Sequence, residues 1–149
     1  MNIYALSVGI ILAALIIIRF KVTRLEQTPF AYPLLLASFP LYYFVFAIYS
    51  NDFVALYNEF VVGLIFFSLA IAAIKSKMKT AAVLIGIGSI SHAVYDGFHN
   101  MLFINSGIPA WWFEFCGSIN LILGMYMIYF ALTTPNNSFK RYREKAPAY

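Results

Sequence analysis

Five apolar stretches, each about as long as a bilayer is thick, dominate this sequence. A helix needs about 20 residues to cross the hydrocarbon core of a membrane. The stretches lie roughly at residues 3–18, 30–49, 53–74, 80–103 and 111–132. The chain is 62% hydrophobic and 11% charged, which leaves more apolar surface than a soluble domain of 149 residues can bury. The sequence therefore predicts an all-α polytopic membrane bundle of five transmembrane helices.

The ten lysine and arginine residues occupy three short segments, at residues 19–24, 75–79 and 140–145. These segments follow the first, third and fifth apolar stretches, so they belong to alternate connections. The positive-inside rule places such segments in the cytoplasm, which predicts an outer N-terminus and a cytoplasmic C-terminus in a cell inner (plasma) membrane. A net charge of +4 arranged in this way indicates membrane topology rather than nucleic-acid binding. We expect residues 1–134 to form one bundle and residues 135–149 a basic cytoplasmic tail.

Both histidines of the chain lie in one polar stripe of the fourth stretch, His92 and His99, with Asp96 between them. Their spacing of i, i+4 and i+7 brings the three side chains within about 60° of one another around a helix. Ionisable groups at membrane depth are costly and usually functional. The stripe is therefore the first candidate site.

Two further carboxylates belong to the same half of the predicted bundle, Glu59 in the third stretch and Glu114 in the fifth. At 1.5 Å per residue, Glu59, Asp96 and Glu114 lie about 9, 10 and 5 Å from the outer edge. We therefore expect the third, fourth and fifth helices to meet and enclose the polar residues. Four neighbours would form a second layer or bound the pocket: Tyr95, Asn100, Ser118 and Asn120.

The stripe predicts a metal site, because side chains at i, i+3 or i, i+4 on a helix can share one ion. The expected ligands are His92, Asp96 and His99, with Glu59 completing the coordination sphere or acting as a base on bound water. The two histidine Cα atoms are about 10 Å apart along the axis. One ion therefore takes part of the stripe with a carboxylate from another helix, two ions share it, or a kink relaxes the spacing.

The ligand types suit zinc, iron or manganese, and they leave copper open. The single cysteine, Cys116, excludes an intrachain disulfide and a cysteine-based zinc cluster. We expect it to be a small packing residue at a helix interface.

The His-x3-Asp-x2-His pattern of residues 92–99 resembles a motif of small uncharacterised bacterial multi-pass membrane proteins. The resemblance covers about ten residues of the chain. It implies a site in the fourth helix and no particular activity.

These features predict a metal-dependent membrane enzyme, a hydrolase or an oxidoreductase, that acts on a lipophilic substrate at a site in the outer leaflet. Glu59 and Glu114 are then the candidate catalytic residues, with Glu114 orienting or protonating the substrate. Two alternatives stay open: a component of proton or metal-ion transport, and a small structural or assembly subunit of a larger membrane complex. The expected partners are membrane lipid, the substrate and further copies or subunits, and not nucleic acid.

Overall fold

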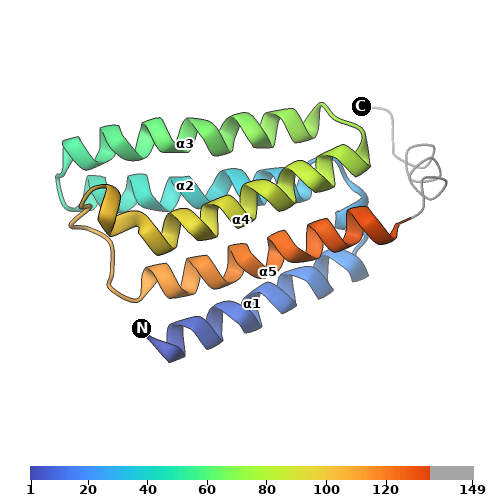
Figure 1. Ribbon diagram of the computed structural model, residues 1–149, viewed down its shortest axis with the longest axis horizontal. Coiled ribbons are helices and arrows are strands. Elements are labelled where there is room, and N and C mark those ends of the chain that lie inside the picture. Colours follow the sequence, from blue (N-terminus) through green and yellow to red (C-terminus); the bar gives the residue numbers. More distant parts are fainter. Residues whose placement is uncertain (135–149) are drawn as a thin grey trace.

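The computed structural model describes residues 1–134, which fold into five long α-helices and one short 3₁₀ helix, η1 (Leu25–Gln27) (Figure 1). The α-helices are α1 (Ile3–Val22), α2 (Ala31–Tyr49), α3 (Phe53–Ile74), α4 (Met78–Leu102) and α5 (Trp112–Thr133). Each of the five is long and apolar enough to cross a membrane, and residues 1–134 contain no strand. The all-α, multi-pass architecture is thus confirmed. The predicted basic tail, residues 135–149, lies outside the described residues.

The helix bounds differ from the expected ones mainly where polar residues extend an apolar stretch. Helix α1 runs four residues further than expected and carries Arg19 and Lys21 in its last turn. Basic side chains are favourable there because they face the negative end of the helix dipole. Helix α3 begins at an N-cap, Asp52, whose side chain accepts a hydrogen bond from the Ala55 N–H. Helix α4 runs without interruption through Gly86 and Gly88.

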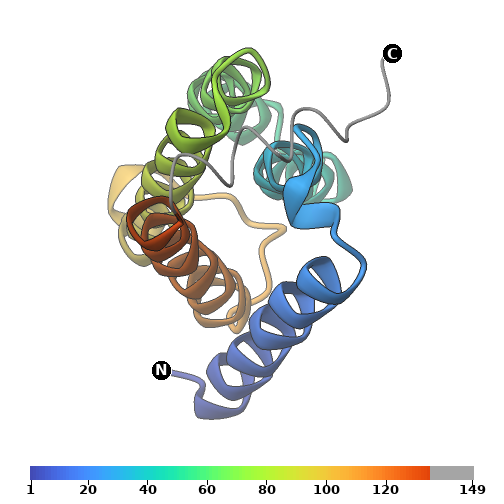
Figure 2. The same cartoon turned by 90° about the vertical axis from the view of Figure 1, so that its right-hand side faces the viewer.

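Helix α4 lies between α3 and α5, while α2 packs on α3 and α1 packs on α5 (Figure 2). Small residues allow these close contacts. A Cβ atom added to Gly124 of α5 would lie 2.9 Å from the carbonyl oxygen of Gly86 on α4. A Cβ atom added to Gly9 of α1 would lie 2.5 Å from the carbonyl oxygen of Phe115 on α5. The central place of α4 turns its polar stripe toward the other helices.

The two ends of the bundle differ in charge. Six basic residues lie at or beyond the end of α1 and around the connection from α3 to α4, and we call this the basic end: Arg19, Lys21, Arg24, Lys75, Lys77 and Lys79. At the opposite end α2 and α4 finish and α3 and α5 begin (Figure 1). That this opposite end faces outward stays a prediction of the positive-inside rule.

The segment that joins α4 to α5 folds back across the bundle toward α2 (Figure 2). Gly107 of this segment packs so closely on α2 that an added Cβ would lie 1.9 Å from the Phe46 carbonyl oxygen. The close approach requires glycine here, and it fixes the segment over the end of the bundle at which the polar stripe lies.

Candidate metal centre

Helix α4 points its polar stripe into the bundle. Its buried residues include His92, Asp96 and His99, and both histidine side chains are fully buried. The helical period alone accounts for this, because the three positions share one face that meets α2, α3 and α5. The structure divides the stripe into two groups of contacts, one with α5 and one with α3.

The first group joins His92 and Asp96 of α4 to Cys116 of α5. One ligand atom from each of the three side chains lies within 4.8 Å of the other two, and all three residues are buried. His92 Nδ1 is 3.3 Å from Asp96 Oδ1. Asn120, one turn beyond Cys116, donates from Nδ2 to the Cys116 sulfur at 3.4 Å and to its carbonyl oxygen at 3.1 Å. We call these three residues with Asn120 the α4–α5 group.

Several polar atoms of the α4–α5 group have no hydrogen-bond partner among residues 1–134: both ring nitrogens of His92, Oδ2 of Asp96 and Oδ1 of Asn120. His92 Nδ1 and Asp96 Oδ1 are close enough for an ion pair, but their direction does not make a hydrogen bond. A buried polar atom without a partner costs about 1–3 kcal/mol. Such atoms in one place could be satisfied by a bound group, which makes this a candidate binding site.

The donor set fits a metal ion. Thiolate, imidazole and carboxylate are the three ligand types that zinc takes in proteins. The thiolate makes the site softer than the predicted imidazole and carboxylate set, which disfavours manganese relative to zinc. Three protein ligands also leave a coordination position open, as in catalytic rather than structural zinc sites.

The second group gathers around Glu59 of α3. Its Oε1 accepts a hydrogen bond from Asn105 Nδ2 at 2.9 Å and lies 2.8 Å from His99 Nε2, while its Oε2 accepts from the Tyr95 hydroxyl at 2.6 Å. Asn105 belongs to the segment after α4 and also donates to the Tyr43 carbonyl oxygen at 3.2 Å. We call Glu59, Tyr95, His99 and Asn105 the Glu59 group.

Tyr43 of α2 connects the two groups. Its hydroxyl donates to Asp96 Oδ1 at 2.5 Å. Its ring stacks on the His99 ring, with centroids 5.2 Å apart and planes 22° apart. The carboxylate of the α4–α5 group and the imidazole of the Glu59 group therefore share one buried tyrosine.

Aromatic rings surround His92. Ring centroids lie 4.6 Å away for Phe66 and 5.6–5.9 Å away for the other three residues, Phe39, Tyr95 and Tyr43. These rings come from α2, α3 and α4. They make the surroundings of the α4–α5 group apolar and shield it from water.

The structure brings six of the nine predicted site residues into these two groups, and Asn120 is one of the six. His92 and Asp96 face Cys116, while Glu59, His99 and Tyr95 contact one another. The four predicted ligands are therefore split between two neighbouring groups. The Glu59 side chain is buried and faces α4 rather than lipid, as the sequence predicts.

Glu114, Ser118 and Asn100 lie apart from both groups, which corrects the predicted convergence. Glu114 Oε1 accepts from the Asn2 backbone N–H at 2.9 Å and lies 3.7 Å from the Met1 nitrogen. Ser118 donates to backbone carbonyls of Phe115 and Leu6, and Asn100 is exposed. The physical reason is the helical period. On α5, Glu114 and Ser118 share the face that packs on α1, whereas Cys116 and Asn120 share the face that packs on α4.

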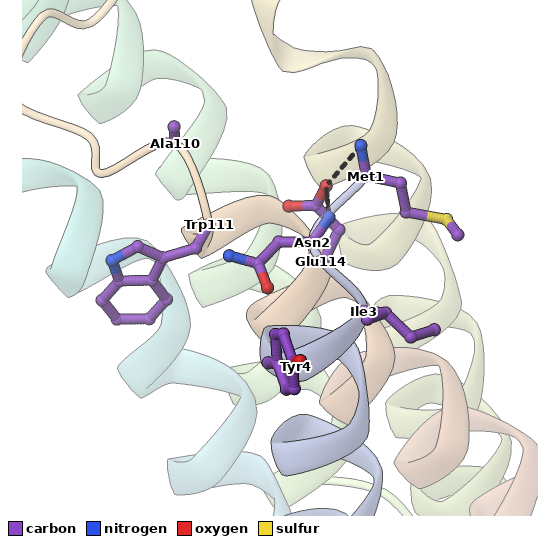
Figure 3. Close-up of a pocket in the computed structure, with 7 residues that line it drawn as sticks. All are labelled: Met1, Asn2, Ile3, Tyr4, Ala110, Trp111 and Glu114. Carbon is purple, nitrogen blue, oxygen red and sulfur yellow. Dashed lines mark hydrogen bonds and ion pairs between the residues drawn. The ribbon is translucent and has the colours of Figure 1, made fainter.

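Figure 3 shows where Glu114 lies. Its carboxylate points at the start of α1, in a shallow hollow of about 520 Å³. The other lining residues are Met1, Asn2, Ile3, Tyr4, Ala110 and Trp111. Glu114 therefore joins α1 to α5 at the surface, and its contacts within residues 1–134 are with the start of α1 rather than with either buried group.

Sequence reasoning missed three residues of the two groups: Cys116, Tyr43 and Asn105. For Cys116 a signal existed, because Asn120 lies four residues later on the same face of an otherwise apolar helix. A single cysteine rules out a multi-cysteine zinc cluster, but it does not rule out one thiolate ligand among other types. Asn105 gave no signal of this kind, since polar residues are common in connections, and Tyr43 gave none because it is one of 11 tyrosines in the chain.

No protein-family model, curated protein or solved structure matches this chain. The resemblance of residues 92–99 to small bacterial membrane proteins therefore stays a prediction. What the fold and the site define is a multi-pass helical membrane protein with a buried His/Asp/Cys group that is able to hold a metal ion. Its function has to be argued from the site, because a helical bundle serves many functions.

Proposed function

We propose that this protein is a membrane metalloprotein whose ion is held by His92, Asp96 and Cys116. The observation that carries the proposal is the set of buried atoms without partners in residues 1–134, both ring nitrogens of His92 and Oδ2 of Asp96, beside the Cys116 sulfur. A metal ion satisfies one ring nitrogen of His92 together with Asp96 Oδ2, and its positive charge offsets the buried carboxylate and thiolate. Zinc suits this ligand set best.

Asn120 and Tyr43 support the proposed ligands. The Asn120 amide donates a hydrogen bond to the Cys116 sulfur, and the Tyr43 hydroxyl donates one to the Asp96 carboxylate, so both proposed ligands are held in direction. Partners of this kind fix the direction of metal ligands and tune their affinity. The two groups thus have the composition of a metal site together with its supporting shell.

We further propose that the ion serves an enzyme reaction on a lipophilic substrate. A metal at such a site polarises a substrate group or lowers the pKa of bound water to about 7. Three protein ligands leave room for a substrate atom, and the aromatic rings around His92 offer an apolar surface of the kind that lines small-molecule sites. The Glu59 group supplies a carboxylate and an imidazole next to it for proton transfer.

The distribution of polar groups weighs against transport. The buried positions of α4 on the basic-end side of His92 are Ala82, Ile85, Gly86, Gly88 and Ser89, and Ser89 is the one polar side chain among them. The polar stripe of this described helix therefore stops at Ser89, short of the basic end. A carrier of protons or ions needs polar groups along its whole path, whereas the observed groups gather at one end.

Metal analysis of the protein purified in detergent tests the proposal. After incubation with zinc and removal of the excess, we expect about one ion per wild-type chain by mass spectrometry. Asp96→Asn and Cys116→Ser should each lower the affinity by about tenfold or more. Asn100→Ala, an exposed change on the same helix, is the matched control and should retain the ion.

Cobalt gives a second readout that does not depend on the amount of protein recovered. Cobalt bound through a thiolate has a sulfur-to-metal charge-transfer band, and Cys116→Ser should abolish this band in protein that remains folded by circular dichroism. Wild-type protein that binds neither ion would refute the metal site and favour a passive subunit.

A further inference from the structure

We propose that Glu59 and His99 form a second site, separate from the metal ligands, in which His99 offers a bare Nδ1 lone pair to the O–H or N–H group of a lipophilic molecule. The geometry of the Glu59 group carries this inference, and the hydrogen-bonding capacity of each side chain leads to it.

The protonation of His99 follows from the partners of Glu59. A carboxylate is an acceptor, and its two oxygens offer about four lone-pair sites. Asn105 donates to Oε1 and Tyr95 donates to Oε2. His99 Nε2 lies 2.8 Å from Oε1, and two bare acceptors do not approach so closely. Nε2 therefore carries the hydrogen, and in a neutral imidazole Nδ1 is then the bare nitrogen.

His99 Nδ1 is buried and has no hydrogen-bond partner within residues 1–134. The rings of Tyr43, Tyr95, Phe103 and Phe113 lie around the imidazole, with centroids 4.9–5.2 Å from its own. Aromatic rings do not replace a hydrogen-bond donor for a nitrogen lone pair. Glu59 binds the opposite ring nitrogen and therefore fixes the direction in which Nδ1 points. None of these contacts supplies Nδ1 with a hydrogen-bond donor.

This arrangement has the chemistry of a proton acceptor. A carboxylate that accepts from one imidazole nitrogen fixes the tautomer, orients the ring and stabilises the imidazolium that forms when the other nitrogen takes a proton. Glu59 is itself fixed by Tyr95 and Asn105, so the pair is set before any ligand binds.

The Glu59 group is distinct from the metal ligands. The ligand atoms that lie together belong to His92, Asp96 and Cys116, whereas His99 directs Nε2 to Glu59. Tyr43 lies between them, with its ring on His99 and its hydroxyl on Asp96. A molecule that reaches His99 is thus next to the proposed metal centre without displacing one of its ligands.

The surroundings define the class of ligand. One acceptor among four aromatic rings suits an apolar molecule with a single hydroxyl or N–H donor, such as a long-chain alcohol, and disfavours a charged one. Phe103 and Phe113 are half-buried, so one layer of side chains separates His99 from the surroundings on that side. A membrane supplies such molecules directly.

The use of this site in a reaction depends on the proposed metal function, but the tautomer of His99 does not. Because the chain has two histidines, protein labelled with ¹⁵N-histidine gives NMR signals from two rings, and His92→Gln leaves those of His99. We expect His99 with a protonated Nε2 and a bare Nδ1, unchanged when zinc is added, while a His92 nitrogen shifts to a metal-bound position. Glu59→Gln should mix the two tautomers of His99, and Glu114→Gln should not.

The same NMR spectra distinguish a failure of this inference from a failure of the proposed metal function. A His99 ring that is doubly protonated, has the opposite tautomer or shifts as a zinc ligand would overturn this inference. A His92 ring that ignores zinc would overturn the metal function alone.

The class of ligand is tested in lipid nanodiscs with 1-dodecanol, and dodecane is the control because it has the same chain and no donor. Dodecanol should move the His99 Nδ1 signal toward a hydrogen-bonded position, and dodecane should leave it in place. Equal shifts with both, or no shift with either, would show that Nδ1 takes no such donor and overturn the assignment.

Discussion

The hydroxyl of Tyr43 and the carboxylate of Asp96, 53 positions apart in the chain, form a buried hydrogen bond of 2.5 Å between α2 and α4. Helices α2 and α4 also meet through aromatic rings, because Tyr43 stacks on His99 and Phe39 lies against His92. The hydrogen bond is the polar link between the two helices at the level of the proposed metal centre.

Tyr43→Phe should destabilise the metal-free protein. Interhelical hydrogen bonds in membranes average about 0.6 kcal/mol. A buried acceptor that loses its donor costs about 1–3 kcal/mol. Asp96 Oδ2 already lacks a partner within the described residues. We therefore expect Tyr43→Phe to lower the free energy of unfolding by about 1–2 kcal/mol, measured with a denaturing detergent. Tyr42→Phe removes a hydroxyl from an exposed neighbour on the same helix and should have little effect. Equal losses for the two variants would contradict the importance of this bond.

The glycines of α4 and α5 should differ sharply in their tolerance of alanine. A Cβ on Gly124 would lie 2.6 Å from the Ile90 side chain and 2.9 Å from a backbone oxygen. Gly124→Ala must therefore push α4 and α5 apart, at a cost of about 1–3 kcal/mol. A Cβ on Gly97 would have no neighbour within 4 Å among residues 1–134. Gly97→Ala should be neutral or stabilising by up to about 1 kcal/mol. Thermal unfolding of both variants checks this, and similar melting temperatures would refute the close packing.

Helix α5 shows which features of this site the sequence predicts and which it does not. Hydropathy and basic residues suffice to place five spans, and the helical period suffices to turn His92, Asp96 and His99 to one face. They do not determine which helix that face meets. Glu114 and Cys116 are two residues apart, which rotates them by about 200° around the helix axis. Because α1 packs on α5, Glu114 faces α1 and Cys116 faces α4. Only the packed structure contains this information, since close contacts of glycines set the rotation of each helix.

Asn105 lies beyond any such reasoning, because it reaches the core from a connection rather than from a helix. Asn105→Asp keeps the size of the side chain, removes its donor and puts a second carboxylate beside Glu59. We expect a loss of about 3 kcal/mol or more in stability, since a buried charge then lacks its partner. Ser106→Ala, a change at the exposed next residue, is the control. Unfolding curves that coincide for the two variants would show that the connection does not hold Glu59.

The predicted topology can be measured with introduced cysteines, because the native Cys116 is buried. Ser106→Cys places a thiol at the end of the bundle opposite the basic end, and Lys77→Cys places one at the basic end; both positions are exposed. A maleimide that cannot cross membranes should label residue 106 in intact cells and residue 77 only after lysis. The reverse order would turn the proposed site toward the cytoplasm.

Zinc should stabilise the protein through the α4–α5 group. A ligand that binds the native state alone adds about 2.7 kcal/mol at a concentration 100 times its Kd, so the melting temperature should rise with zinc until the site is saturated. Cys116→Ser removes the thiolate with little change of volume and should abolish most of the rise, while Ser118→Ala, on the α1 face of the same helix, should keep it. Asp96→Asn should also reduce the rise in melting temperature that zinc causes, because Asp96 and Cys116 are proposed to hold the same ion. If zinc stabilised Cys116→Ser and Asp96→Asn as much as the wild type, the ion would be binding elsewhere. The unpartnered atoms of His92 and Asp96 would then have to bind a ligand other than a metal.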